Sequence, residues 1–240
     1  MAILLLILEL GCIAMYQAFD LVSQFRHIRL DALALLLKWS NVSNDRHCNA
    51  LFMLIDLQHN AGDGLVSFDE CFTTKIGGAP HEIKATSICG QYLTKHPDVD
   101  IQKLLSDAGL KPDEEKSKFN DLTKYKSGSI VPFGDDLLLA FAKLNENGRG
   151  YFPTREAYLN SLAVMWSEIH KYYQQKDVCI PVLGGGLTNI GETMLTHQEL
   201  VDLIIESYKL FTYKIPNPQR LRIICSRKDD ISLNKIGESI

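Results

Sequence analysis

From residue 49 to residue 225, short apolar runs alternate with longer segments whose apolar positions follow helical spacing. Apolar runs that are bounded by turn residues predict buried strands, and they cover 50–57, 65–68, 137–144, 178–183 and 221–225. Helical spacing over 155–174 and 198–211 follows two good N-cap residues, Thr154 and Thr196. This alternation predicts a three-layer α-β-α fold of the α/β class with a mixed, mostly parallel sheet.

The helix predicted over 155–174 has an apolar stripe that faces the core, so its aromatic members are packing residues first. The stripe consists of Tyr158, Leu162, Met165, Trp166, Ile169 and Tyr173. Thr196 and Glu199 match a capping box at the start of the later helix. Residues 111–126 mix both signs of charge, and we interpret them as a solvated surface connection.

Residues 1–48 differ from the rest of the chain because long apolar runs dominate them. The first run lacks the basic start and the cleavage site of a secretory signal, and it falls short of the ~20 apolar residues that cross a membrane. Two interpretations are open: a marginal or truncated membrane helix, or a pair of helices packed on a soluble body. We therefore divide the chain into an apolar helical segment 1–48, a main domain 49–228 and a charged tail 229–240, which we expect to fray.

The composition of the chain limits the classes of molecule that we expect it to bind. Hydrophobic residues make up 46% of the chain and charged residues 22%, as in an ordinary globular protein. The net charge of −4 gives no overall attraction to nucleic acid, so we expect no nucleic-acid partner. The six cysteines are scattered, without a CxxC pair or a His/Cys cluster. This pattern predicts reduced thiols in an intracellular protein, with no metal site and no cofactor.

The most informative stretch is 178–191, VCIPVLGGGLTNIG, in which a predicted strand ends in Gly184, Gly185 and Gly186. Without Cβ atoms, these residues allow positive φ and a close approach by another group. A strand, a glycine loop and a helix can form a cradle of backbone N–H groups for phosphate. The alternative is a glycine-rich turn that binds nothing, and three glycines alone do not decide between the two.

Polar residues also follow other predicted strands. They are Asp56, Asp69, Glu70, Asn145, Asn147 and Arg149. In open α/β sheets, ligands bind beyond the carboxyl ends of the strands, so these side chains are candidates for ligand contacts. The alternative is that the acids cap helices or are solvated in loops.

Two segments, 138–151 and 180–190, resemble divergent macro domains of prokaryotic immune effectors, in particular those of Thoeris-type anti-phage defence. The order of strands and helices around them is also similar, over about residues 50–226. The resemblance implies a macro-like fold that binds ADP-ribose. In such effectors, a macro domain often follows N-terminal membrane helices, which bears on the interpretation of residues 1–48.

The resemblance also implies roles for individual residues. Asp56 would accept the exocyclic N–H of adenine, whereas Asp69 departs from the family, which often has a ribose-facing asparagine there. The diphosphate would lie against backbone N–H groups of Gly184, Gly185, Gly186, Leu187 and Thr188, with the next helix N-terminus assisting. Asn145, Asn147 and Arg149 would lie near the same rim, where Arg149 is a partner for phosphate or carboxylate.

The function implied by the resemblance is that of a sensor for an ADP-ribose-derived nucleotide, with ADP-ribose or a conjugate of it as the partner. The alternative is an ADP-ribosyl hydrolase in which Asp69 or Glu70 acts as a general base, and a third interpretation is an α/β interaction protein with an empty loop. No motif fixes a catalytic role, so we expect binding. Contact with the cytoplasmic face of the inner membrane through residues 1–39 stays open, and so does a homo-oligomer.

Overall fold

A computed structural model of the chain describes residues 50–54, 64–79, 81–186, 188–216, 219–225 and 231–237. Residues 49–240 form one compact unit and residues 1–48 another. The predicted apolar segment 1–48 lies outside the described residues, and so do Asp56 and Leu187. Among the described residues, every helix is too short or too polar to cross a bilayer.

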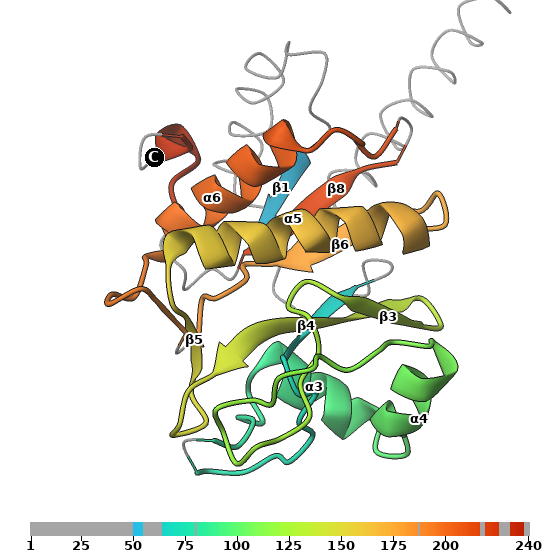
Figure 1. The fold of residues 1–240 in the computed structure, drawn as a ribbon. Coiled ribbons are helices and arrows are strands. Elements are labelled where there is room, and N and C mark those ends of the chain that lie inside the picture. The colour runs from blue at the N-terminus through green and yellow to red at the C-terminus, as the bar shows by residue number, and fades with distance from the viewer. Residues whose placement is uncertain are drawn as a thin grey trace, which may run out of the picture. The chain divides into compact units, whose positions relative to one another are not determined.

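Two groups of strands make up the sheet (Figure 1). The first group contains only parallel pairs, in the order β1 (Ala50–Leu54), β8 (Leu221–Cys225) and β6 (Val178–Pro181). The second group has the order β2 (Leu65–Asp69), β4 (Asp136–Leu144), β5 (Gly150–Phe152) and β7 (Asn189–Ile190), with β3 (Ile130–Phe133) also paired to β4. Among the described strand pairs, only β3–β4 and β4–β5 are antiparallel, and a parallel bridge from Gly64 to Cys179 links the two groups. The sheet is mixed and mostly parallel, as predicted.

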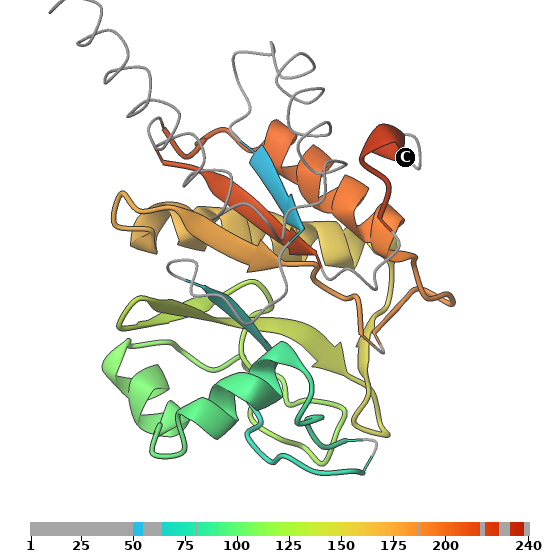
Figure 2. The same cartoon turned by 180° about the vertical axis from the view of Figure 1, so that it is seen from behind.

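Helices cover both faces of the sheet. One face carries α5 (Arg155–Tyr172) and α6 (His197–Leu210), and the other carries α3 (Ile88–Lys95) and α4 (Ile101–Asp107), which are in front in Figure 2. Alternating residues of β4 explain this arrangement. The ring of Phe141 lies 5.6 Å from that of Tyr158 on α5, whereas Leu138 packs in a cluster with residues of α3 and α4. The predicted three-layer architecture is confirmed.

Capping residues explain where the two long helices begin. Thr154 accepts a hydrogen bond from the first turn of α5, and Thr196 forms the predicted capping box with Glu199 at the start of α6. The predicted stripe of α5 is buried except for its last member, Tyr173, which is partly exposed at the C-cap. Trp166 is 1% exposed and is a packing residue, as predicted.

The interpretation of residues 111–126 as a solvated connection is wrong at two positions. Ser117 and Tyr125 are buried, and both are tied to Glu70. Ser117 Oγ donates to Glu70 Oε1 at 2.8 Å, and Tyr125 N donates to Glu70 O at 2.7 Å. Most charged residues of the segment are exposed, which explains why its composition is that of a solvated loop.

Residues 231–237 lie against α6 instead of fraying. They contain a short 3-10 helix, Leu233–Lys235. Ser232 N donates to Gln198 Oε1 at 2.9 Å, and Gly237 N donates to Asp202 Oδ1 at 2.9 Å. These two hydrogen bonds join this part of the tail to the first turns of α6.

Candidate functional site

The carboxyl ends of β2, β4 and β6 meet at one edge of the sheet because these strands are parallel. There β2 ends at Asp69, β4 leads into the loop 145–149, and β6 leads into residues 182–188, which we call the glycine loop. β5 pairs with β7, and a Cβ built on Gly150 would lie 3.1 Å from Thr188 Oγ1. The structure therefore brings the loop 145–149 and the glycine loop together.

The three glycines of the glycine loop lie in different structural environments. Gly184 has a φ of +83°, a left-handed conformation that favours glycine. A Cβ on Gly185 would lie 2.7 Å from the ring of His197, the first residue of α6. Gly186 is exposed, and a Cβ there would meet no atom within 4 Å. Conformation and close packing thus explain the first two glycines, and the third faces open space.

The base of the glycine loop is fixed by α5. The hydroxyl of Tyr158, a residue that is 0% exposed, donates to the backbone O of Leu183 at 3.0 Å. Beyond this anchor, the N–H groups of Gly184 and Gly186 have no acceptor among the described residues. Two backbone donors without an acceptor among the described residues, in one short loop, are what an anion cradle requires.

The predicted order of strand, glycine loop and helix is interrupted. β7 and a turn at Gly191 lie between the glycine loop and α6, so the helix does not follow the loop directly. The start of α6 is nevertheless beside the loop, because the ring of His197 packs on Gly185. The partial positive charge of the helix N-terminus is therefore close to the loop, which favours an anion there.

The carboxylate of Asp69 accepts hydrogen bonds from the turn that follows it. Its Oδ1 accepts from Cys71 N at 2.8 Å and from Thr73 N at 3.2 Å, and its Oδ2 accepts from the Thr73 hydroxyl. Desolvation raises the pKa of Asp69, and this effect outweighs the three hydrogen bonds, which lower it. The resemblance placed Asp69 where a ribose would lie, but these contacts make it the organiser of the turn after β2.

Glu70 has a structural role that the sequence pattern did not reveal. The residue is 4% exposed, and its Oε1 accepts from Ser117 Oγ at 2.8 Å and from Leu144 N at 3.1 Å. It thereby joins the end of β2, the segment 111–126 and the end of β4. The contacts of Asp69 and Glu70 thus use both carboxylates within the fold, and of the two only Glu70 is fully buried.

The loop 145–149 is a turn that Asn145 stabilises. Asn145 Oδ1 accepts from Asn147 N at 2.9 Å and from Arg149 N at 3.0 Å. Gly148 is buried, and a Cβ there would lie 2.4 Å from the Cβ of His81. Asn145 is thus a turn residue, whereas Asn147 and Arg149 are exposed.

Residues that the sequence pattern did not single out lie beside this loop. Tyr151 on β5 is in register with Lys143 on β4 and with Asn189 on β7. Lys118 Nζ lies 5.5 Å from the centre of the Tyr151 ring. Strand register and the path of the segment 111–126 decide these contacts, and neither can be read from residue types along the chain.

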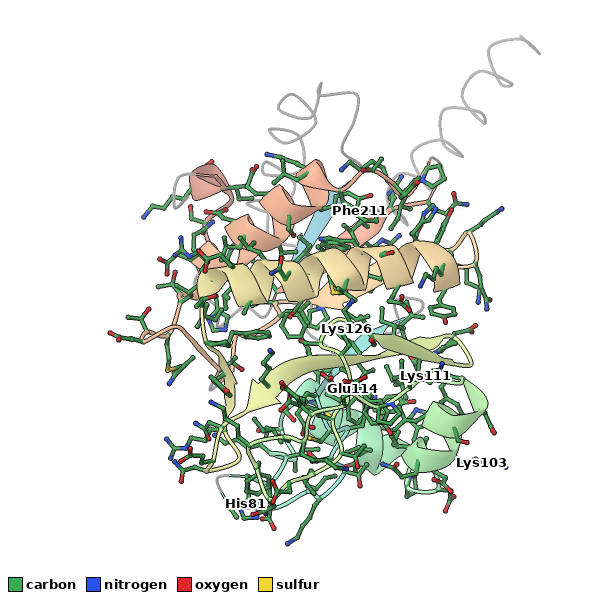
Figure 3. All side chains as sticks on the ribbon, viewed as in Figure 1. His81, Lys103, Lys111, Glu114, Lys126 and Phe211 are labelled. Atoms are coloured by element: carbon green, nitrogen blue, oxygen red, sulfur yellow. The ribbon has the colours of Figure 1, made fainter. Side chains whose placement is uncertain are left out.

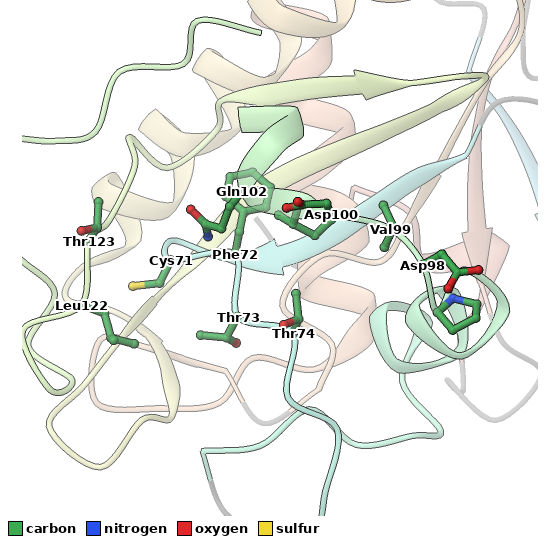
Figure 4. A pocket seen from close by; sticks show the side chains of 12 residues that line it. Cys71, Phe72, Thr73, Thr74, Asp98, Val99, Asp100, Gln102, Leu122 and Thr123 are labelled. Carbon is green, nitrogen blue, oxygen red and sulfur yellow. The ribbon is translucent and has the colours of Figure 1, made fainter. Parts of the chain in front are cut away.

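A pocket of about 650 Å³ opens between the turn after β2, the connection from α3 to α4 and the segment 111–126 (Figure 4). Its walls include Thr73, Asp98, Gln102 and Thr123. None of the described residues of the glycine loop is among the residues that line it.

The described residues offer no set of metal ligands. No group of three or more His, Cys, Asp or Glu side chains among them could hold a metal ion. The four described cysteines are buried and form no disulfide bond, and burial raises the pKa of Cys71 to about 12. These thiols therefore pack as small apolar groups, and the chemistry of this edge comes from backbone donors and exposed polar side chains.

Comparison with known proteins agrees with this geometry. A family model described as Thoeris protein ThsA, Macro domain, matches residues 53–226, which include both loops of the site. The chain is also similar to the Thoeris protein ThsA of Bacillus amyloliquefaciens (strain Y2), with 26% identity over 178 residues. The alignment covers 71% of this chain and 59% of that protein, so the chain spans less than two thirds of the length of this relative. The resemblance seen in the sequence is confirmed, and the chain belongs to the family of ThsA macro domains.

Proposed function

We propose that this chain is the nucleotide-binding module of an anti-phage effector and that its glycine loop binds the diphosphate of an ADP-ribose-derived signal. The observation that carries the proposal is the pair of N–H groups, of Gly184 and Gly186, that lack an acceptor among the described residues. They lie beside the N-terminus of α6, and both kinds of donor attract a diphosphate. Family membership supports the fold and the link to defence.

Other residues complete the proposed site. Leu187 and Thr188 would also donate to the diphosphate, and Asp56 would accept the amino group of adenine; Leu187 and Asp56 lie outside the described residues. Asn147 and Arg149 are exposed on the neighbouring loop, where they contact the polar groups of the ligand. Asn145 and Asp69 contribute by shaping their turns.

The sharpest test changes the charge at the open position of the loop. Gly186→Asp adds a carboxylate where a Cβ meets no atom within 4 Å, so the fold has room for it. In calorimetric titration we expect this variant to lose ADP-ribose binding, because the carboxylate repels the diphosphate. Gly186→Asn has the same shape without the charge and should keep most of the affinity. Wild-type affinity in both variants, or a wild type that binds neither ADP-ribose nor its conjugates, would refute the proposal.

Hydrolysis of ADP-ribosyl groups is the second function that the resemblance implies, and no contact in the site favours it. The carboxylates of Asp69 and Glu70 accept hydrogen bonds from their own chain. Release of ADP-ribose from an ADP-ribosylated protein would establish this activity. The release should then stop in Asp69→Asn, which keeps an acceptor oxygen for the turn.

We also propose that residues 1–48 carry the output of binding and contact the inner membrane through residues 1–39. The basis is the apolar composition of this segment. Co-flotation of the full chain with vesicles of bacterial phospholipid tests this contact, and a variant with Leu5→Asp and Ile7→Asp should float less. Equal flotation of both proteins would contradict it. Sedimentation with and without ADP-ribose tests whether the chain forms a homo-oligomer, which the sequence leaves open.

A further inference from the structure

Two lysines are placed next to Tyr151 by the structure, one by a ring contact and one by strand register. Lys118 Nζ lies 5.5 Å from the centre of its ring, and Lys143 is directly across from it on β4. Arg149 precedes Tyr151 in the same hairpin. Within the described part of the chain, no carboxylate forms an ion pair with Lys118, Lys143 or Arg149.

This cluster is basic in a chain that is acidic overall. The net charge is −4, and Lys124, in the same segment as Lys118, pairs with Glu115 at 3.1 Å. The loop 145–149 contains one acid, Glu146, which is exposed. Like charges that lie close together repel each other, and a bound anion relieves this repulsion. Unpaired cations around one ring therefore indicate a position for an anion.

The strand register places this cluster relative to the glycine loop. Residues directly opposite each other in paired strands share a face, so Lys143, Tyr151 and Asn189 form a row across β4, β5 and β7. Gly150 and Thr188 contact each other on the other face. With strands spaced by about 4.8 Å, the row begins next to the glycine loop and extends roughly 10 Å from it, along the edge where β4 ends.

We propose that Lys118, Lys143 and Tyr151 form a subsite for an anionic substituent, a phosphate or a carboxylate, that the nucleotide carries beyond its diphosphate. The inference rests on the proposed function, in which the glycine loop holds the diphosphate. Lys118 and Lys143 supply the positive charge, and Arg149 adds a planar pair of donors. Tyr151 acts as a positioning residue, because its ring holds the Lys118 ammonium by a cation–π contact.

The test is calorimetric titration of the full chain with three probes: ADP-ribose, ADP-ribose 1″-phosphate, and ADP-ribonate, in which C1″ is a carboxylate. We expect at least one anionic probe to bind about tenfold more tightly than ADP-ribose, since two exposed charge contacts together contribute about that factor. The probe that binds more tightly identifies the anion. The preference should shrink as salt is added, because salt screens exposed charges.

Substitutions show which residues cause the preference for the anionic probe over ADP-ribose. Lys118→Gln combined with Lys143→Gln should remove the preference and bind ADP-ribose within about twofold of wild type. The matched control is Lys103→Gln combined with Lys111→Gln, which also removes two positive charges. These lysines lie near α4 and away from His81, which packs beside Gly148 of the loop 145–149 (Figure 3). This control should keep the preference. Tyr151→Leu should weaken the preference, and Tyr151→Phe, which keeps a ring for Lys118, should restore it.

Each outcome decides between the two proposals. Equal affinity of the wild type for all three probes overturns the subsite and leaves the glycine-loop proposal standing. No binding of any probe overturns both. A full preference in the variant with both Lys118→Gln and Lys143→Gln also overturns the subsite, because the anion then binds elsewhere. Melting temperatures measured without ligand show whether each variant is folded.

Discussion

Replacing Tyr158 by phenylalanine removes a single oxygen atom from the core and should loosen the glycine loop. Phenylalanine keeps the ring contacts with Phe141 and Phe152, whose centroids lie 5.6 and 5.3 Å away. The change removes the 3.0 Å hydrogen bond to the backbone O of Leu183, a residue that is 1% exposed. A buried carbonyl without a partner costs about 1–3 kcal/mol. We therefore expect the free energy of unfolding to fall by about 2 kcal/mol.

Urea denaturation of the full chain measures this change when it is followed by tryptophan fluorescence, to which Trp166 on the same helix contributes together with Trp39. The melting temperature should fall by about 4–8 °C for a domain of this size, and the affinity for ADP-ribose should fall as well because the loop has lost its anchor. The matched control is Tyr213→Phe, at a residue that is 60% exposed, where the change should stay within about 0.5 kcal/mol. If Tyr158→Phe is as stable as this control, the hydrogen bond does not hold the loop and the reasoning is wrong.

Other contacts give three further predictions. Glu70→Ala leaves the Leu144 N–H and the Ser117 hydroxyl hydrogen without their acceptor and should lower the free energy of unfolding in urea by about 2–4 kcal/mol; Glu70→Gln should lower it less. Because burial raises the pKa of Asp69, its contribution to stability is largest below pH 3.8 and falls as pH rises towards the folded pKa. Asp69→Asn should remove this fall in the free energy of unfolding between pH 3.8 and the folded pKa. Asp56→Ala should abolish any calorimetric preference for ADP-ribose over its inosine analogue.

The sequence was sufficient for features that depend on near neighbours along the chain. Thr154 and Thr196 each satisfy an N–H group three residues ahead, so the helix starts could be predicted from local residue types. The apolar run 137–144, interrupted only by Lys143, predicted β4, because a strand that is covered on both faces shows no regular polar alternation. These features were enough for the three layers and for the position of the glycine loop.

The rest of the site depends on contacts between distant parts of the chain. The burial of Ser117 is decided by its hydrogen bond to Glu70, 47 positions away, and not by the charged residues around it. The position of Lys118 over Tyr151 depends on the path of a whole segment. Asp69 is at the predicted edge, but its hydrogen bonds to the following turn set the direction of its carboxylate, and a carboxylate in a loop has several such options.

The two-sided burial of β4 has a consequence for the entropy of binding. Leu139 and Ala140 are 0% exposed, and Glu70 holds the N–H of Leu144 at the end of the strand. A strand covered in this way is among the last parts of a protein to open, so the loop 145–149 is ordered before a ligand arrives. The glycine loop leads instead into β7, a strand of two residues, so the proposed binding of a nucleotide would restrict mainly that side. Substitutions that stiffen the glycine loop without filling its open face should therefore raise the affinity for the nucleotide more than equivalent substitutions in the loop 145–149.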